Sequence, residues 1–399
     1  MTYSKVSIIG QGYVGLPLAV MIVKLGVKVT GIDSNSNTID FLNRGISHIE
    51  DVPSSEISAA RASGLYEASS SFKNVSESDV VVICVPTPLN GQHQPDLSYL
   101  NSALADMSKF LKKGTLIILE STVSPGTTRN LVVPAIEKGT SSSIKNFFLV
   151  FSPERIDPRN LNWSISNTPK LVGGLTDRCC KMGMAFYSMF IDEVVECDSL
   201  EVAETSKLLE NSFRLVNISF INELAIYCDK IGIAINDVIR AAATKPFGYM
   251  PFYPSIGVGG HCIPVDPVYL SHSARELDVP TRFLDLAIQV NNEVPKYFVN
   301  KAREKLGDLQ DKKIMVVGVA YKPNIADVRE TSVKPLIEGL IQDGAKVFWH
   351  DELVKEWNGQ KSSKLTGDYD LAIIATQHDY IDLSQLGKIP LLVAGRVLR

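Results

Sequence analysis

The sequence lacks the features that mark membrane-spanning, secreted and nucleic-acid-binding proteins. Nowhere do about 18 apolar residues run together, and the opening MTYSKVSIIGQG has neither a basic region before a long apolar core nor a small-residue cleavage site. The formal net charge is −4, and no run of Lys and Arg would suit nucleic acid or an anionic membrane surface. We therefore expect a cytoplasmic protein that binds neither membranes nor nucleic acids.

Cysteine is scarce and scattered. Six cysteines occur without a C-x-x-C pair or the paired spacing of a metal site, so reduced thiols are expected rather than disulfides. A zinc site built from His261, Cys262, Asp266 and His272 is set aside, because adjacent His and Cys side chains cannot easily converge on one ion. We predict no metal site. The cysteines are residues 84, 179, 180, 197, 228 and 262.

What the chain does have is an alternation of strand-like and helix-like segments. With 399 residues, 45% of them apolar, it is too long for one core and predicts two or three domains. Residues 6–33 show a strand, a glycine turn, an apolar-periodic helix and a second strand, and strand-like runs follow at 79–86, 114–122 and 146–154. This alternation predicts an α/β fold with a doubly wound parallel sheet.

The rest of the chain divides into a helical middle and a second α/β region. Helical apolar spacing covers residues 199 to about 230 and 280–306, with a shorter helix at 233–244 for which Asn236 is a plausible cap. Residues 312–351 repeat the opening plan of strand, glycine turn, helix and strand, and further strands are expected at 369–376 and 390–395. We predict a Rossmann domain (1–198), a helical central domain (199–306) and a smaller Rossmann-like domain (307–399).

The opening glycine turn predicts a dinucleotide site. Gly10, Gly12 and Gly15 follow a strand and open a helix, whose N-terminal N–H groups and dipole suit a pyrophosphate. Asp33 ends the next strand, where a carboxylate accepts hydrogen bonds from a ribose diol and repels a 2′-phosphate. The pattern therefore favours NAD over NADP, against the alternative of tight strand–helix packing with no ligand. Tyr13 and Val14 lie within this loop.

The second copy of this plan carries different residues. It keeps only Gly318 of the three glycines and adds Lys322, Pro323 and Arg329. It is therefore not a second dinucleotide fingerprint, and a basic loop beside a helix N-terminus suits a phosphate-bearing ligand of another shape. The alternative is that Lys322 and Arg329 are solvated loop charges.

Residues 257–267, GVGGHCIPVDP, place a cysteine in a glycine- and proline-rich loop. Glycines allow close backbone approach and prolines oppose a regular helix, so Cys262 is expected on a shaped loop. Lys207 and Asn211 stand at i and i+4, on one face of the predicted helix. Taken singly, each has an ordinary explanation: Cys262 as a buried small residue, Lys207 as a surface charge and Asp266 as a turn former.

Seven motifs in order carry a resemblance: GQGYVGLP, CVPTP, ESTVSPGT, SPER, KLLEN, GVGGHCIPVDP and GVAYKPNIADVRETS. Together they resemble the nucleotide-sugar 6-dehydrogenases, the family of UDP-glucose, GDP-mannose and UDP-N-acetylhexosamine dehydrogenases. The resemblance spans nearly the whole chain. It implies an N-terminal NAD domain, a helical middle that forms a homodimer, and a C-terminal domain for the UDP-sugar.

The resemblance also implies catalytic roles. Cys262 matches the cysteine that attacks the C6 aldehyde, giving a thiohemiacetal and then a thioester that water hydrolyses. Lys207 and Asn211 resemble the pair that stabilises developing oxyanion charge, and Asp266 resembles the residue that holds the catalytic water with Lys207. Glu154 is similar to the carboxylate that assists water attack.

Thr122 resembles a polar partner near that water, and Thr122, Thr87 and Arg329 match positions that contact NAD. Arg396 resembles an arginine of the family's tail motif, but Ala394 replaces the usual acid, which leaves the orientation of Arg396 open. The implied substrate contacts are Glu154, Arg155, Lys207, Asn211, Phe252, Tyr253, Gly259, Lys322 and Arg396.

The stretch TKPFGYMPFYPSIGVGG resembles the version in enzymes that act on UDP-N-acetylglucosamine or, next, UDP-N-acetylgalactosamine. Aromatic and proline surface would suit an N-acetyl group, although the same aromatics could pack at a dimer interface. Three alternatives stay open: the same reaction on UDP-N-acetylmannosamine or UDP-glucose, a secondary-alcohol dehydrogenase of the 6-phosphogluconate type, and a non-catalytic NAD sensor. Uronic acids of this kind feed capsule and lipopolysaccharide O-antigen, which the resemblance implies as the pathway.

Overall fold

The computed structural model describes residues 3–157, 160 and 162–394, and it divides into two compact units. The first unit contains the chain up to Leu209 together with residues 268–273, and the second contains residues 210–267 and the chain from Ala274 onward. The division into three domains at 198 and 306 stays a prediction.

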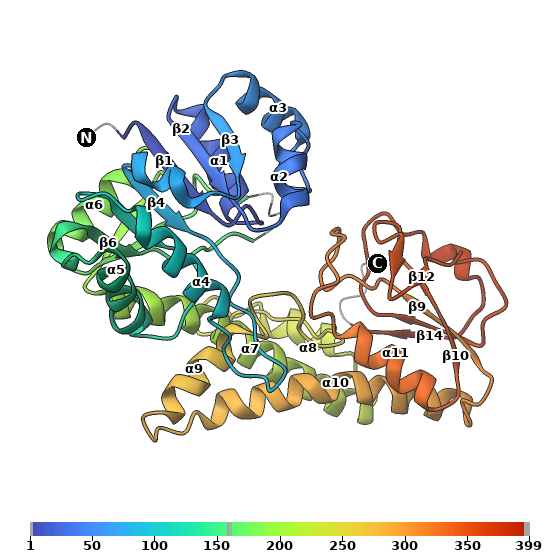
Figure 1. Ribbon diagram of the computed structural model, residues 1–399. Coiled ribbons are helices and arrows are strands. Elements are labelled where there is room, and N and C mark those ends of the chain that lie inside the picture. The colour runs from blue at the N-terminus through green and yellow to red at the C-terminus, as the bar shows by residue number, and fades with distance from the viewer. Residues whose placement is uncertain (1–2, 158–159, 161, 395–399) are drawn as a thin grey trace. The chain divides into compact units, whose positions relative to one another are not determined.

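The first unit is built on an eight-stranded sheet with the order β3-β2-β1-β4-β5-β6-β7-β8 (Figure 1). Its first six strands have the order of a doubly wound dinucleotide fold. Strand pairing is parallel throughout except between β6 and β7, which are antiparallel, so the predicted parallel sheet needs this one correction. The strands are β1 (Lys5–Ile9), β2 (Lys28–Ile32), β3 (Tyr66–Ser69), β4 (Val80–Ile83), β5 (Leu116–Leu119), β6 (Phe148–Phe151), β7 (Lys170–Gly174) and β8 (Val194–Cys197).

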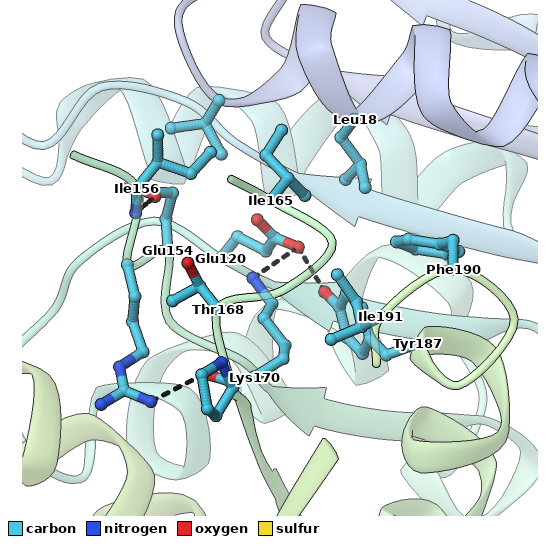
Figure 2. Close-up of a pocket in the computed structure, with 13 residues that line it drawn as sticks. Leu18, Glu120, Glu154, Ile156, Ile165, Thr168, Lys170, Tyr187, Phe190 and Ile191 are labelled. Carbon is cyan, nitrogen blue, oxygen red and sulfur yellow. Dashed lines mark hydrogen bonds and ion pairs between the residues drawn. The ribbon is translucent and has the colours of Figure 1, made fainter. Parts of the chain in front are cut away.

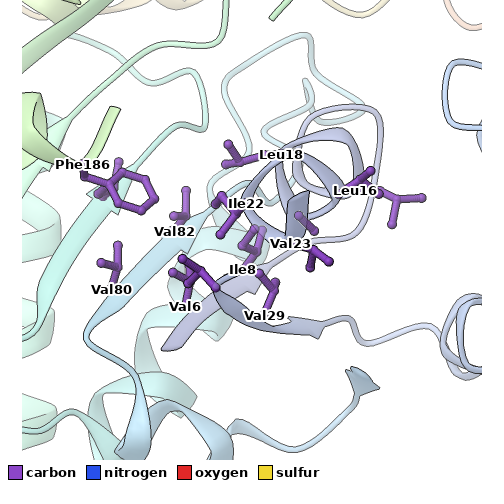
Figure 3. Close-up of a cluster of buried hydrophobic side chains, with 14 of the residues drawn as sticks. Val6, Ile8, Leu16, Leu18, Ile22, Val23, Val29, Val80, Val82 and Phe186 are labelled. Atoms are coloured by element: carbon purple, nitrogen blue, oxygen red, sulfur yellow. The ribbon is translucent and has the colours of Figure 1, made fainter. Parts of the chain in front are cut away.

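Helices cover both faces of this sheet because alternate residues of its strands point to opposite sides. Val80 and Val82 of β4 belong to one apolar cluster, which Figure 3 shows with Ile22 and Phe186, whereas Val81 belongs to a cluster on the other face. All three valines are fully buried, as expected for a strand covered on both sides. The helices are α1 (Gly15–Lys24), α2 (Ser36–Asn43), α3 (Ser54–Ala62), α4 (Ser98–Met107), α5 (Val133–Thr140) and α6 (Asp177–Tyr187).

The second unit combines long helices with a four-stranded parallel sheet of order β10-β9-β13-β14. Helix α11 (Val333–Gln342) packs on α10 and on this sheet through Leu336 and Leu340, which lie in the cluster of Ile314 and Val316. The other elements are α8 (Ile235–Ala242), α10 (Arg282–Leu306), β9 (Lys313–Val317), β10 (Lys346–His350), the hairpin β11 (Glu356–Trp357) and β12 (Gln360–Lys361), β13 (Leu371–Ile374) and β14 (Leu391–Val393).

Helices α7 (Leu200–Lys230) and α9 (Asp266–Arg275) contribute residues to both units. The long helix α7 and the helix α10 agree with the predicted helical middle, but α9 was not predicted. The predicted cap Asn236 is wrong: α8 begins at Ile235 after Ala234, so Asn236 lies in the first turn and its buried Oδ1 has no hydrogen-bond partner among the described residues. No helix in the described part of the chain carries an apolar stretch that could cross a bilayer.

The central strands are shorter than predicted at their carboxyl ends. β4, β5 and β6 end at Ile83, Leu119 and Phe151, about three residues before the predicted ends at 86, 122 and 154. Residues just beyond the carboxyl ends of parallel strands leave the ladder and line ligand sites in folds of this kind. The segments that follow carry three predicted site residues, Thr87, Thr122 and Glu154.

Candidate active site

The structure gives a different reason for glycine at each of the three positions of the first turn. Gly10 has φ +92°, and a Cβ there would collide with the carbonyl of Cys84, the residue that follows β4. A Cβ on Gly15 would collide with the carbonyl of Gly10, so this glycine lets α1 start close to the turn. A Cβ on Gly12 would meet no atom within 4 Å. The protein's own packing therefore explains two glycines, and Gly12 leaves open space where a pyrophosphate would approach.

Asp33 stands at the end of β2, beside this turn, as predicted. Its Oδ2 accepts from the backbone N–H of Gln11 (2.9 Å), its Oδ1 accepts from the N–H of Asn35 (2.9 Å), and the residue remains partly exposed. Tyr13 and Val14 lie between the turn and α1, with Tyr13 39% exposed. Glycine turn, helix start and partly exposed acid together fit the pyrophosphate and ribose of NAD.

Sequence reasoning missed the buried side chain of Gln11, which supports the glycine turn from below. Gln11 is fully buried, donates through Nε2 to the carbonyl of Ile8 (2.9 Å) and accepts through Oε1 from the hydroxyl of Tyr66 (2.8 Å). These bonds tie the loop to β1 and β3 and so fix its shape. A polar residue between two motif glycines was the signal that could have found it.

The predicted cofactor residues Thr87 and Thr122 follow β4 and β5. Thr87 is buried, and its carbonyl accepts from the hydroxyl of Tyr269 (3.1 Å). Thr122 is partly buried, two residues after Glu120. Both lie beyond the carboxyl ends of their strands, on the edge of the sheet where Gly10 ends β1.

Glu154 and Lys207 lie in the first unit and interact electrostatically. Burial raises the pKa of the Glu154 carboxyl, whereas the charge of Lys207, the N–H of Ile156 and the charge of Lys170 lower it. Lys207 is 6% exposed, which contradicts the alternative that it is a surface charge. Arg155 donates through a guanidinium nitrogen to the carbonyl of Pro169 (2.7 Å), so it braces its own loop.

A second carboxylate that sequence reasoning missed is Glu204, one turn before Lys207 on α7. It is fully buried and accepts from the backbone N–H groups of Gly126 (2.6 Å) and Thr128 (2.8 Å). Burial raises the pKa of Glu204 to about 7, against the lowering effect of these hydrogen bonds. Glu204 thus ties the loop that follows Thr122 to the helix that carries Lys207.

The second unit holds Asn211, Cys262 and Asp266. Asn211 donates through Nδ2 to the Asp266 carboxylate (2.5 Å), and both side chains are buried. The carbonyl of Cys262 accepts from the N–H of Asp266 (2.8 Å), which makes residues 262–266 a single turn leading into α9. Cys262 itself is exposed, and the other cysteines are buried or partly buried. The alternative of a buried structural cysteine is therefore wrong for this position.

The glycines before Cys262 let the loop lie against the segment 321–332 within the second unit. A Cβ on Gly259 would collide with the carbonyl of Glu330, and one on Gly260, at φ +86°, with the ring of Tyr321. Gly260 donates its N–H to the carbonyl of Arg329 (3.1 Å). The loop bearing Cys262 is thus held against the basic loop that was predicted to bind phosphate.

Beside this contact the second unit has a pocket of about 890 Å³, lined by Tyr253, Gly257, Tyr321 and Ser332 among others. Arg329 lies in the same loop region, and its guanidinium pairs with both oxygens of Asp327 at 2.5–3.0 Å. Burial and the nearby charge of Arg329 lower the pKa of His261. Phe252 packs edge-on against Phe213 of α7 (ring centroids 5.7 Å apart), and Arg396 lies outside the described residues.

Three models of the UDP-glucose/GDP-mannose dehydrogenase family match the chain in order: the NAD binding domain over residues 4–191, the central domain over 201–293 and the UDP binding domain over 315–398. A UDP-N-acetyl-D-glucosamine 6-dehydrogenase of Pseudomonas aeruginosa is 34% identical over 391 residues, which covers 94% of this chain and 90% of that protein. A UDP-N-acetyl-D-mannosamine dehydrogenase of Campylobacter jejuni is 33% identical over 351 residues, covering 86% and 85%. The solved structure of the UDP-D-ManNAc dehydrogenase of Pyrococcus horikoshii superposes with a TM-score of 0.90 at 28% identity, covering 99% of this chain and 96% of that one. The chain therefore belongs to the UDP-glucose/GDP-mannose dehydrogenase family, with NAD as its cofactor.

Proposed function

We propose that the chain oxidises the C6 hydroxymethyl group of a UDP-N-acetylhexosamine to a carboxylate, with Cys262 as a covalent nucleophile. The observation that carries the proposal is the exposed Cys262 on a braced glycine loop, with Asn211 and Asp266 hydrogen-bonded to each other in the same unit. A dehydrogenase that stops at a ketone, or a protein that only senses NAD, needs no such thiol.

The turn of Gly10, Gly12 and Gly15 would hold the cofactor pyrophosphate, and Asp33 would hold the ribose; Thr87, Thr122 and Arg329 are further proposed contacts. Each NAD⁺ accepts one hydride, so the four-electron oxidation of an alcohol to an acid uses two. The remaining chemistry belongs to the chain's own residues.

In the first oxidation, C6 loses a hydride and its hydroxyl loses a proton, which leaves an aldehyde. The Cys262 thiolate then adds to the aldehyde carbon, and the oxygen takes up a proton to give a thiohemiacetal. Lys207 and Asn211, one helical turn apart on α7, are proposed to donate hydrogen bonds to this oxygen as charge develops on it. Loss of a second hydride and the hydroxyl proton gives a thioester.

Hydrolysis releases the product. A water oxygen attacks the acyl carbon, the carbon–sulfur bond breaks, and Cys262 leaves as a thiolate. Glu154 is proposed to accept the water proton, with Thr122 as a polar partner, and Asp266 with Lys207 to hold the water. The pKa of Glu154 is raised by burial, which suits a group that must take up a proton near neutral pH.

The UDP-sugar is proposed to bind in the second unit, at the pocket between the Cys262 loop and the segment 321–332. Lys322 in that segment would contact the diphosphate. The other proposed substrate contacts are Glu154, Arg155, Lys207, Asn211, Phe252, Tyr253, Gly259 and Arg396.

The N-acetylhexosamine class is supported by the relatives, whose names include UDP-N-acetyl-D-glucosamine 6-dehydrogenase and UDP-N-acetyl-D-mannosamine dehydrogenase at nearly the same identity. UDP-N-acetylglucosamine was the substrate predicted from the sequence. UDP-N-acetylmannosamine, the epimer at C2, is an equal candidate, because several of the similar proteins are named as dehydrogenases of that sugar. The product would be a uronic acid for surface polysaccharide synthesis.

The test is the ratio of NADH formed to sugar consumed, measured with four UDP-sugars: N-acetylglucosamine, N-acetylmannosamine, N-acetylgalactosamine and glucose. A ratio of two with acid product from one of the N-acetyl sugars supports the proposal, and a ratio of one would indicate an aldehyde or ketone product. Cys262→Ala should form no acid, while the matched control Cys228→Ala, which changes a buried cysteine of the same unit, should. Acid formation by Cys262→Ala at the wild-type rate would refute the covalent route.

We also propose that the chain forms a homodimer through α7. Phe213, Phe220 and Tyr227 recur at heptad spacing on one side of this helix and are 46%, 62% and 59% exposed. Burying such a stripe against a second copy would remove apolar surface from water. Light scattering should give twice the mass of the chain, and Phe220→Glu should give the mass of one chain.

A further inference from the structure

A buried cluster of three polar side chains with no role in the proposed function lies in the first unit; Glu120 opens the motif ESTVSPGT, and the other two lie outside the family motifs. Glu120 follows β5, Lys170 begins β7 and Tyr187 ends α6, and Figure 2 shows the three converging. The ammonium of Lys170 lies 3.1 Å from the Glu120 carboxylate and 4.9 Å from the centre of the Tyr187 ring. The Tyr187 hydroxyl donates to the same carboxylate. The side chains of Lys170 and Glu120 are 12% and 2% exposed.

This cluster is connected to the segment that carries Glu154. The Lys170 ammonium donates to the carbonyl of Pro153 (3.1 Å), the residue before Glu154. In return, Arg155 donates to the carbonyl of Pro169 (2.7 Å), the residue before Lys170. Glu154 therefore lies between two cross-links that join the same pair of segments.

The reason for these cross-links is the antiparallel pairing of β6 with β7. The regular ladder joins Val150 to Gly174 and Phe151 to Gly173, and in the same register Glu154 would face Lys170. Pro153 and Pro169 have no N–H, so backbone pairing cannot continue through them. Side chains replace the missing ladder: besides Lys170 and Arg155, the Ser152 hydroxyl donates to the carbonyl of Leu171 (2.7 Å).

Lys170 also contributes to the charge balance around Glu154. The groups that act on the Glu154 carboxyl, besides its burial, are the charges of Lys207, Lys170 and Glu120 and the N–H of Ile156. A small pocket is lined by Glu120, Glu154 and Lys170 together with apolar side chains. The ammonium thus stands between the two carboxylates.

We propose that Lys170 is a positioning residue for Glu154: Glu120 and Tyr187 hold its ammonium, which fixes the Pro153 carbonyl and so aims the Glu154 carboxylate for thioester hydrolysis. The inference rests on the proposed function, because it assigns Lys170 to a step in which Glu154 accepts a proton from water. Lys170 itself touches no reacting atom in this scheme.

The competing explanation is that Lys170 only neutralises the buried Glu120. The double variant Glu120→Gln, Lys170→Met separates the two, because it removes both charges together while Gln can still accept from Tyr187. A merely structural ion pair predicts wild-type turnover for this variant. The positioning role predicts a slow hydrolytic step, since a displacement near 1 Å can lower the rate about 10²-fold.

The experiment mixes enzyme, NAD and the UDP-sugar that the wild type oxidises, and follows NADH in a stopped-flow instrument. We expect the double variant to release about two NADH per site in a rapid burst and then turn over about 10²-fold more slowly than the wild type. Mass spectrometry of acid-quenched protein should show an acyl adduct on Cys262. Glu154→Gln should show the same burst and adduct, and Lys170→Arg, which keeps a cationic donor, should recover most of the turnover. Wild-type turnover without adduct in the double variant would overturn the inference.

Two controls keep the outcome decisive. Glu120→Gln alone retains the bond from Lys170 to Pro153 and an uncharged acceptor for the Lys170 ammonium, so it should slow thioester hydrolysis much less than the double variant does. An adduct as large as that of Glu154→Gln would refute the role of the bond from Lys170 to Pro153. The Glu120→Gln measurement remains a test of the positioning role even if the double variant does not fold. Cys262→Ala identifies the other failure: if it still forms acid, the proposed function is wrong, whereas normal turnover of the Lys170 variants beside an inactive Cys262→Ala refutes only the positioning role.

Discussion

The two glycine turns of the chain are built alike and used differently. Gly10 (φ +92°) donates its N–H to Ile32 at the end of β2, and Gly318 (φ +79°) donates to His350 at the end of β10. In each, a Cβ would collide with a carbonyl of the neighbouring strand. In each, an aspartate follows the second strand and accepts from the N–H of the residue after the glycine. The two turns therefore have the same backbone conformation and the same hydrogen bonds to the neighbouring strand and its aspartate.

The two aspartates differ in how much hydrogen-bond acceptor capacity each retains for a ligand. Asp33 is partly exposed and accepts one N–H on each oxygen. Asp351 is 1% exposed and accepts from the N–H groups of four residues and from Nε2 of the buried His378 (3.0 Å). The four donors are Val319, Ala320, Leu353 and Val354. The Nδ1 of His378 accepts from the N–H of Asn324 (2.8 Å), so the imidazole proton is on Nε2.

This comparison explains why one copy binds NAD and the other is the UDP binding domain. An acid whose lone pairs are all engaged inside the fold cannot also hold a ribose diol. Helix α1 starts at Gly15, directly after its turn, whereas α11 starts only at Val333, and the intervening loop carries Lys322 and packs against the Cys262 loop. Under the proposed function, the second turn keeps its geometry and the UDP-sugar binds at the longer loop that follows it.

Replacing each aspartate with alanine is the most direct test of the difference between the two turns. Asp351→Ala leaves four N–H groups, three of them buried, and the buried His378 without their acceptor, so we expect the free energy of unfolding to fall by about 3–5 kcal/mol. Asp33→Ala should cost only about 1 kcal/mol of stability, because water reaches its site, and should instead raise KM for NAD. Calorimetry and NAD kinetics on both variants test this. Equal losses of stability would refute the distinction.

The acid in the second turn also predicts a pH dependence. Burial raises the pKa of Asp351, but the hydrogen bond from His378 and the N–H groups of Val354 and Val319 lower it, and the net pKa lies below the ordinary 3.8. A depressed folded-state pKa contributes stability above the unfolded pKa that is lost as pH falls through the folded value. The difference in unfolding free energy between wild type and Asp351→Ala should be constant above about pH 5 and shrink below about pH 4. Urea unfolding at several pH values measures it, and a difference that grows in acid would contradict the assignment.

Much of the fold could be predicted, because strands and helices alternate with clear periods. What was missed has physical causes. β7 ends in two glycines, and β8 contains Glu196 and is largely exposed, so neither has the apolar pattern of a buried strand. The helix α9 was missed because Pro267 was taken as a breaker, although proline is favoured in the first turn of a helix, where its missing N–H would have no partner.

The candidate site divides in the same way. Residues within motifs, such as Cys262 and Asp33, could be found because local spacing carries the chemistry. Glu204 and Lys170 could not, because their roles depend on partners far along the chain, and sequence distance says nothing about those contacts. Gln11 lies within the motif GQGYVGLP, but its bond to Tyr66 also joins residues far apart in the sequence. One signal was available in the sequence: Glu120 directly follows the apolar run LIIL, and a polar residue next to a buried run is informative because buried polar groups are rare in a core.

Within the first turn, the glycines themselves can be separated. Gly12→Ala should leave stability unchanged, because its Cβ meets nothing, but it should raise KM for NAD about tenfold by filling the space of the pyrophosphate. Gly10→Ala should lower stability by about 1–3 kcal/mol through its positive φ and its contact with Cys84. Thermal unfolding and NAD titration of the two variants distinguish the effects. A destabilised Gly12→Ala with normal NAD binding would mean that Gly12 serves packing.

The smallest expected effect concerns the division of labour between Asp33 and its neighbour. In the first turn Asn35 caps α2, accepting from the N–H groups of Asn37 (3.0 Å) and Thr38 (3.4 Å), whereas in the second turn Asp351 itself accepts from the N–H groups that follow it. Asn35→Ala should therefore cost about 1 kcal/mol of stability, and Asn35→Gly only a few tenths. Neither should change KM for NAD, because Asp33 keeps its place at the end of β2. If Asn35→Ala weakened NAD binding as much as Asp33→Ala, the cap and the ribose site would be one function, and the first turn would resemble the second more than its geometry indicates.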